Sequence, residues 1–151
     1  MGALGGCKAK IGAACDSALK CSVRGERSCD LSAPGGYCTI EGCSHGSCPK
    51  EAACVKVYGS DFLTVACDPA REDIGNEPHD DCEPDQVCLP EGLCADEVWA
   101  RTSCRRECND DGDCRDGYRC ASTGSDGIYG APDPDHPTRV VNLQICVPVD
   151  F

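Results

Sequence analysis

Cysteine constrains the fold of this chain more than any other residue, because it occupies 17 of the 151 positions. Leu, Ile, Val and Phe together supply only 24 residues, too few for an ordinary apolar core. A high cysteine content in a chain with few apolar side chains is typical of folds in which disulfides replace much of the core. The sequence therefore predicts a small disulfide-rich fold.

Metal binding is the alternative use of so many thiols, and it needs closely spaced ligand pairs such as C-x2-C. The chain has no C-x2-C, and its closest cysteines are Cys104 and Cys108. The three histidines, His45, His79 and His136, are scattered. We therefore favour structural disulfides over a zinc or iron-sulfur protein, and expect an oxidising compartment: periplasm, cell surface or medium.

Charge is distributed unevenly along the chain. Residues 1–67 hold 7 Lys or Arg and 6 Asp or Glu, whereas residues 68–151 hold 7 and 20. Because phosphate binding needs a basic face, this balance argues against nucleic acid as a partner. No run approaches the roughly 20 apolar residues of a membrane-spanning helix.

The cysteines after Cys7 form two series of eight with similar spacing. The intervening lengths are 5, 7, 8, 4, 4, 5 and 12 in the first series and 5, 5, 9, 3, 5, 5 and 25 in the second. YCTIEGCSHGSCPKEAACV also aligns with SCRRECNDDGDCRDGYRCA, and VACDP with QICVP. We therefore predict two tandem eight-cysteine modules with four disulfides inside each, of undetermined pairing. Their members are Cys15, Cys21, Cys29, Cys38, Cys43, Cys48, Cys54 and Cys67, then Cys82, Cys88, Cys94, Cys104, Cys108, Cys114, Cys120 and Cys146.

The repeat divides the chain into five parts. These are a signal remnant and tether at 1–14, modules at 15–67 and 82–146, an acidic linker at 68–81 and a tail at 147–151. Pro69, Gly75 and Pro78 are typical of an exposed connector. The charged cluster Glu77, His79, Asp80, Asp81, Glu83 and Asp85 is therefore interpreted as linker rather than as a metal site.

Regular structure is expected to be short β-hairpins with little helix. ACVKVYG and FLTVACD alternate well enough to form a hairpin, and RVVNLQICV is a further strand. KEAACVKV and ADEVWAR have room for one or two helical turns. Residues 122–138, rich in Gly, Pro and Asp, are interpreted as an inserted loop that faces a partner. Trp99 is expected to be a buried filler, and Tyr37, Tyr58, Tyr118 and Tyr129 to be buried or interface residues.

One acidic loop has the residue types of a calcium site, because Ca²⁺ takes oxygen ligands from flexible loops. The loop contains Asn109, and its candidate ligands are Asp110, Asp111, Asp113 and Asp116. Cys114 stands where an EF-hand loop has glycine, so we favour a solvated turn and expect no required cofactor.

The sequence contains no motif that supports catalysis. G-x-S-x-G, H-E-x-x-H and C-x-x-C are all missing, and disulfide-bonded thiols cannot act as nucleophiles. A hydrolase that uses His79 or His136 with nearby carboxylates is the weakest alternative.

The odd cysteine, Cys7, ends the tetrad L-G-G-C, which begins at Leu4. This tetrad resembles the lipobox of bacterial lipoproteins. The resemblance implies that Met1 to Gly6 are the end of a signal peptide and that the Cys7 thiol carries a diacylglycerol. The alternatives for Cys7 are a free thiol, an intermolecular bridge, or a place in one of the modules.

Longer stretches extend this resemblance from Leu4 to Cys146. IGAAC, GGYCTIEGCSHGSCPKEAACV and CNDDGDCRDGYRC, together with the lipobox, resemble the cysteine-rich outer-membrane lipoproteins of myxobacteria and related Gram-negative bacteria. The resemblance implies a surface or outer-membrane location, with which Lys8 is compatible, and implies no activity. CNDDGDCRDGYRC is also similar to the centre of whey-acidic-protein domains, but the adjacent cysteine pair of that family is missing.

The sequence thus predicts a non-enzymatic cell-surface lipoprotein. It would be a rigid, disulfide-stapled binding or structural module for adhesion, an envelope complex or extracellular assembly, with a protein or surface partner outside the cell. The alternatives are a secreted protease inhibitor and a metal-binding cysteine-rich protein.

Overall fold

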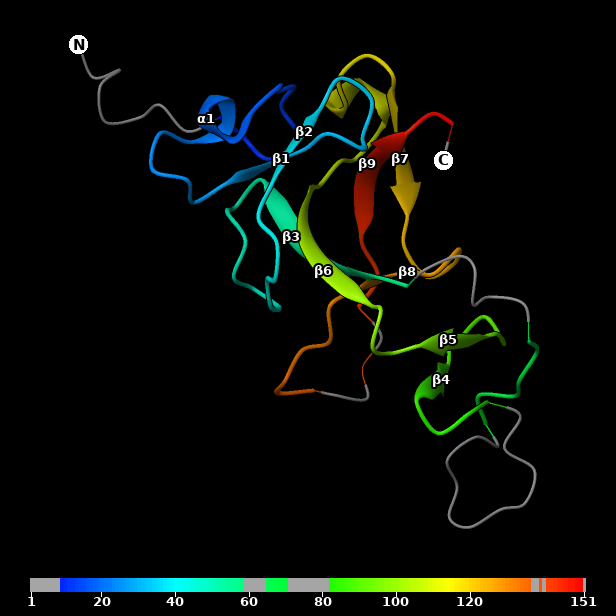
Figure 1. The fold of residues 1–151 in the computed structure, drawn as a ribbon. Coiled ribbons are helices and arrows are strands. Elements are labelled where there is room, and N and C mark those ends of the chain that lie inside the picture. The colour runs from blue at the N-terminus through cyan, green and yellow to red at the C-terminus, as the bar shows by residue number, and fades with distance from the viewer. Residues whose placement is uncertain (1–8, 59–64, 71–81, 137–138, 140, 151) are drawn as a thin grey trace.

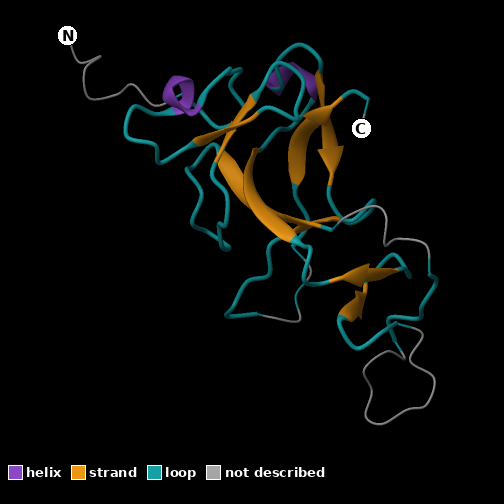
Figure 2. Cartoon of the chain, viewed as in Figure 1, coloured by secondary structure: helices purple, strands orange, loops and turns teal. Residues whose placement is uncertain are grey.

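Short antiparallel strands make up most of the regular structure (Figures 1 and 2). The computed structural model describes residues 9–58, 65–70, 82–136, 139 and 141–150. In this part of the chain helix is limited to α1, Ala18–Cys21, and the 3-10 turn η3, Asp111–Asp113. The predicted small, disulfide-rich, mainly β fold is therefore confirmed. The strands are β1 Ser28–Asp30, β2 Tyr37–Thr39, β3 Ala52–Val57, β4 Gln86–Cys88, β5 Cys94–Asp96, β6 Arg101–Arg106, β7 Tyr118–Ser122, β8 Ile128–Gly130 and β9 Gln144–Pro148.

The central sheet has the order β6-β3-β8, with every pairing antiparallel. Strand β3 confirms the strand expected in ACVKVYG, and it replaces the helical turn considered for KEAACVKV. The hairpin predicted between ACVKVYG and FLTVACD is wrong, because the neighbours of β3 in the sheet are β6 and β8. Within FLTVACD, residues 62–64 lie outside the described residues, and Ala66 forms an isolated bridge with Leu93.

Strand β8 lies in the segment that the sequence indicated as an inserted loop. A turn through Asp126 and Gly127, both with positive φ, returns the chain to the sheet. Ile128 is buried there, and the Ala131 N–H donates to the Cys54 carbonyl at 2.9 Å. The interpretation of 122–138 as a free loop is therefore wrong: it supplies an edge strand of the central sheet.

All sixteen cysteines assigned to disulfides are bonded in pairs, and Cys7 lies outside the described residues. The bridges are Cys15–Cys29, Cys21–Cys38, Cys43–Cys54, Cys48–Cys104, Cys67–Cys88, Cys82–Cys94, Cys108–Cys120 and Cys114–Cys146. Cys48–Cys104 and Cys67–Cys88 join the two predicted modules. The predicted grouping into two independent sets of four bridges is therefore wrong, and the β3–β6 pairing also crosses the predicted boundary.

The bridges follow a pattern of four cysteines rather than eight. In each group the first cysteine bonds the third and the second bonds the fourth. We name the groups the first unit (15–38), second unit (43–54 with Cys104), third unit (67–94) and fourth unit (108–146). The third unit is nested inside the second, between Cys54 and Cys104.

Each unit closes on a hairpin or strand pair in which its third and fourth cysteines lie directly opposite each other. The opposed pairs are Cys29 and Cys38, Cys54 and Cys104, Cys88 and Cys94, and Cys120 and Cys146. The two bridges of a unit also lie against each other, since three of its sulfur atoms are within 4.8 Å of one another. Each of these four strand pairs is thus anchored by two adjacent disulfides.

Two small apolar clusters complete the interior. Ile11, Tyr37 and Tyr118 belong to the first, together with several cysteines, and Val55, Ile128, Ile145 and Val147 form the second. Trp99 is 56% exposed, in a turn closed by the Ala100 N–H and the Glu97 carbonyl. The prediction that Trp99 fills the interior is therefore wrong.

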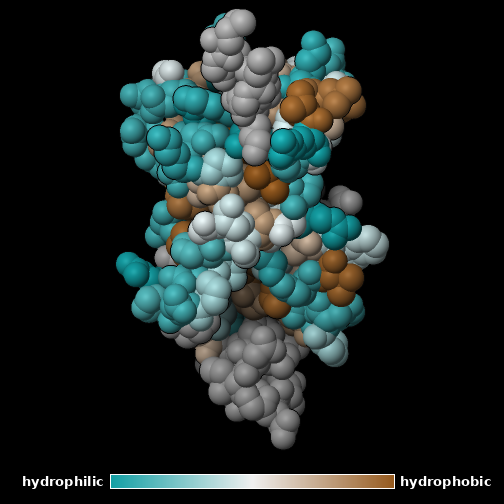
Figure 3. All heavy atoms as spheres, turned by 90° about the vertical axis from the view of Figure 1, so that its left-hand side faces the viewer, coloured by the Kyte–Doolittle hydropathy of each residue, from teal (hydrophilic) through white to brown (hydrophobic). Residues whose placement is uncertain are grey.

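The outer surface is largely hydrophilic on the face shown in Figure 3, where apolar residues form small separate areas. Within the described ranges, we find no helix that combines the length and the apolar character of a membrane span.

Candidate binding site

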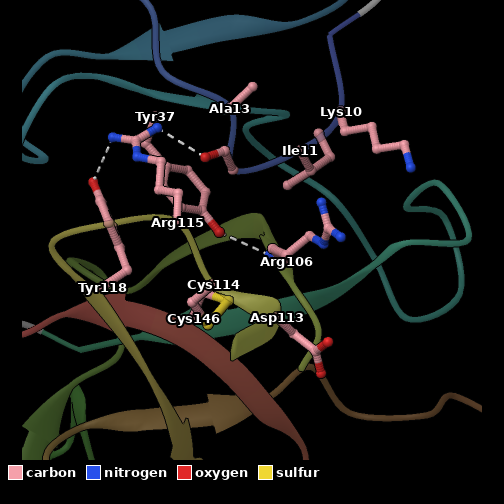
Figure 4. Close-up of a pocket in the computed structure, with 11 residues that line it drawn as sticks. Lys10, Ile11, Ala13, Tyr37, Arg106, Asp113, Cys114, Arg115, Tyr118 and Cys146 are labelled. Carbon is pink, nitrogen blue, oxygen red and sulfur yellow. Dashed lines mark hydrogen bonds between the residues drawn. A yellow bond between two sulfur atoms is a disulfide. The ribbon is translucent and has the colours of Figure 1, made fainter. Parts of the chain in front are cut away.

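A pocket of about 290 Å³ lies between the start of the chain and the fourth unit (Figure 4). Ile11, Tyr37 and Tyr118 supply its apolar lining, together with the Cys114–Cys146 bridge. The bridge and the two tyrosines belong to strands or loops that disulfides fix. One wall of the pocket is therefore covalently restrained, whereas residues 10–13 of the lining precede the first disulfide-bonded cysteine.

Arg115 joins the fourth unit to the first at one wall of this pocket. Its guanidinium donates to the carbonyl oxygens of Gly12 at 2.8 Å and Pro34 at 2.6 Å, and also to the carbonyl of Gly36. The Tyr118 hydroxyl donates to the same Pro34 carbonyl at 2.9 Å. Because three backbone carbonyls occupy its donors, Arg115 has mainly a structural role.

The two tyrosines pack together beside Arg115. The ring centroids of Tyr37 and Tyr118 are 5.7 Å apart, and the Arg115 guanidinium lies 4.4 Å from the Tyr118 centroid. The Arg106 N–H donates to the Tyr37 hydroxyl at 2.8 Å. Burial raises the pKa of both phenols, so they remain neutral hydrogen-bonding groups at neutral pH.

Two cations, Lys10 and Arg106, lie on the opposite side of the pocket, as Figure 4 shows. Arg106 ends β6, and Lys10 belongs to a segment fixed by hydrogen bonds from Ile11 to the Glu51 carboxylate and from Gly12 to the Cys38 carbonyl. Neither head group forms an ion pair or hydrogen bond with another described residue. This side of the pocket is consequently basic.

The acidic loop of the fourth unit uses its carboxylates as caps for backbone N–H groups. Asp110 accepts from the Gly112 N–H at 2.8 Å, Asp111 from Cys120 at 2.8 Å, and Asp113 from Asn109 at 2.7 Å. Hydrogen bonds from the N–H groups of Asn109 and Asp110 hold the pKa of the Asp113 carboxyl below its usual range.

Calcium therefore has no prearranged site in this loop. Asp116 is exposed, and no three of these carboxylates bring oxygen atoms within 4.8 Å of one another. Among the described residues, the sets of three possible ligand atoms that lie within 4.8 Å of one another consist of cysteine sulfurs, and these sulfurs are disulfide-bonded. The turn preferred from the sequence agrees with this geometry.

The two described histidines, His45 and His136, do not line the pocket. His45 and His136 flank Asp133, with ring nitrogens 3.9 and 3.2 Å from its carboxylate. The Asp135 N–H and the His136 side chain lower the pKa of the Asp133 carboxyl. His79 and its neighbours Glu77, Asp80 and Asp81 lie outside the described residues, whereas Glu83 and Asp85 are exposed.

Sequence reasoning missed the pocket because its charged side chains come from distant parts of the chain. Lys10 precedes every disulfide-bonded cysteine, Arg106 lies between Cys104 and Cys108, and Arg115 follows Cys114. Nothing in their local sequence links them. Only the packing of the fourth unit on the first brings them together.

Comparisons of the chain with protein-family models, curated proteins and solved structures found no match. The function of this chain is therefore inferred from its own geometry.

We expect Arg115→Ala to destabilise the oxidised protein by about 2 kcal/mol, because it leaves carbonyls at the junction of two units without their donor. Denaturant unfolding with the disulfides intact measures this loss. Arg101→Ala is the control, because Arg101 is exposed at the start of β6. Equal stability of the two variants would contradict the role given to Arg115.

Proposed function

We propose that this protein is a non-enzymatic binding module that acts outside the cytoplasm, held at the bacterial outer membrane by a lipid on Cys7. Its partner would be a protein or another surface molecule outside the cell. The observation that carries the binding role is the pocket beside Arg115, one wall of which belongs to disulfide-restrained units.

Rigidity supports a binding role rather than a catalytic one. A ligand that enters a preformed pocket requires little ordering of the protein, so less binding free energy is lost. The described lining of this pocket includes no serine, threonine or histidine, and its two cysteines are bonded to each other. Nucleophilic catalysis by a hydroxyl of serine or threonine or by a thiol therefore has no support at this site.

The eight disulfides indicate an oxidising, extracellular or secreted environment, because cytosolic thiols are kept reduced. These bridges use sixteen of the seventeen cysteines, and Cys7 is the one that remains. Acylation of Cys7 accounts for the odd number and for the L-G-G-C tetrad.

Expression in a Gram-negative host behind a lipoprotein signal peptide tests the attachment. We expect the protein to fractionate with membranes, and its intact mass to include the acyl groups, whereas Cys7→Ser gives an unmodified soluble protein. Ala9→Ser, which keeps the thiol, is the matched control. Alkylation should label sixteen further thiols only after reduction.

An unacylated Cys7, or free reaction of the other cysteines without reduction, would overturn the proposal. The first result would remove the membrane attachment, and the second would remove the oxidised location.

A further inference from the structure

The cations on the rim of the pocket differ from three other cations of the fold, which form ion pairs. Arg27 pairs with Glu51, Arg105 with Asp30, and Lys56 with Glu97. Lys10 and Arg106 instead face the pocket without such partners in the described structure. The chain carries a net charge of −12, so carboxylates for pairing are abundant elsewhere.

Nearby carboxylates are already engaged. Glu51 lies within electrostatic range of Lys10, but it accepts from the Ile11 N–H at 3.1 Å and pairs with Arg27 at 3.7 Å. Asp113 lies near Arg106, but its Oδ2 accepts from two backbone N–H groups. The fold thus holds two cations at the mouth of a pocket and neutralises neither directly.

The pocket interior has a different character from its rim. Ile11 is fully buried and Tyr37 is 1% exposed, so the apolar surface open to a ligand comes from the Cys114–Cys146 bridge and the Tyr118 ring. A volume of about 290 Å³ has room for one side chain or one sugar ring rather than for a long segment. A fitting ligand therefore has a compact, mainly apolar body and an anionic end.

We infer that this pocket binds a carboxylate attached to a compact apolar or aromatic group, with Arg106 and Lys10 on the carboxylate and the Cys114–Cys146 bridge and the Tyr118 ring against the body. Arg106 matches a carboxylate through paired N–H donors, and Lys10 adds a point charge. Asp113 on the same rim disfavours a doubly charged group such as phosphate. The inference rests on the proposed binding function and names its ligand class.

Two sources offer this chemistry: the C-terminal residue of a peptide and an acidic sugar. N-acetyl-phenylalanine and glucuronate are probes for the two sources. Phenylacetate and phenylacetamide have nearly the same shape but differ in charge, so comparing them measures the effect of the carboxylate. Titration followed by amide NMR shifts, at low and high salt, measures binding at the pocket. We expect phenylacetate to shift the Ile11, Gly12 and Arg106 amides and phenylacetamide to bind at least about tenfold more weakly.

The variants test the roles of the two cations. Arg106→Gln should weaken phenylacetate binding about tenfold, and Lys10→Gln somewhat less, whereas Arg106→Lys should keep part of the affinity. Lys20→Gln is the control, since Lys20 is an exposed cation on α1 outside the pocket. Unchanged amide spectra elsewhere show that the variants are folded.

The inference fails if phenylacetate and phenylacetamide bind equally, if Arg106→Gln and Lys20→Gln behave alike, or if none of the carboxylates shifts the pocket amides. Any of these three results would overturn the ligand class alone. The proposed function would still hold if Cys7 is acylated and the other cysteines are oxidised. Tighter binding of N-acetyl-phenylalanine assigns the pocket to peptide ends, and tighter binding of glucuronate assigns it to acidic sugars.

Discussion

Full reduction of the folded protein is expected to abolish its structure at room temperature. Each disulfide contributes about 2–4 kcal/mol, largely by restricting the unfolded chain. The net stability of a domain is only about 5–15 kcal/mol, so the loss of eight bridges exceeds it even when their effects are not additive. The two small apolar clusters cannot replace that contribution.

Circular dichroism and amide NMR before and after excess dithiothreitol measure this effect. We expect the native far-ultraviolet spectrum and the dispersed amide signals to disappear together. Oxidised protein treated with iodoacetamide alone is the control and should remain native. Native spectra in the fully reduced, alkylated protein would show that side-chain packing alone maintains the fold.

Gly36→Ala is expected to have the largest effect of any single substitution considered for this protein. Gly36 has φ +75°, and a Cβ there would overlap the Cys15 carbonyl oxygen and lie 2.8 Å from the carbonyl carbon. Both obstacles are backbone atoms held by the Cys15–Cys29 bridge, so they cannot rotate away. We expect a loss of about 3 kcal/mol or more in unfolding free energy.

Gly42→Ala provides a matched control. Gly42 has nearly the same backbone conformation, φ +74°, with no atom within 4 Å of the added Cβ. Its substitution carries the cost of the left-handed conformation alone, about 1 kcal/mol. Denaturant unfolding of the two oxidised variants separates the steric overlap from this conformational cost, and equal losses would refute the overlap.

The cysteines show how far the sequence predicts this fold. Their number, their lack of metal-ligand spacing and the scarcity of apolar residues were enough to predict disulfides, and the position of Cys7 outside the two series left the sixteen that are bonded. The alignment of YCTIEGC with SCRREC also matched cysteines that have the same position in their units. Cys38 and Cys104 are each the fourth cysteine of a unit, and Cys43 and Cys108 are each the first.

The eight-cysteine period failed at the nested unit. Cys67 aligned with Cys146 in sequence, but Cys67 opens the third unit and Cys146 closes the fourth. Spacing along the chain cannot reveal that Cys104 belongs with Cys54, because the separation of 56 residues between Cys48 and Cys104 contains a complete unit. The pocket was unpredictable for the same reason, since contacts between units create it.

The nested arrangement also determines where this chain tolerates change in length. Val57 and Arg101 are opposite each other on paired strands, so the polypeptide departs from the central sheet and rejoins it at neighbouring points. Both bridges of the third unit, Cys67–Cys88 and Cys82–Cys94, are internal to the excursion between those points. That excursion is a natural grafting position: a different guest sequence there would leave the remaining six crosslinks and their strand pairs in place.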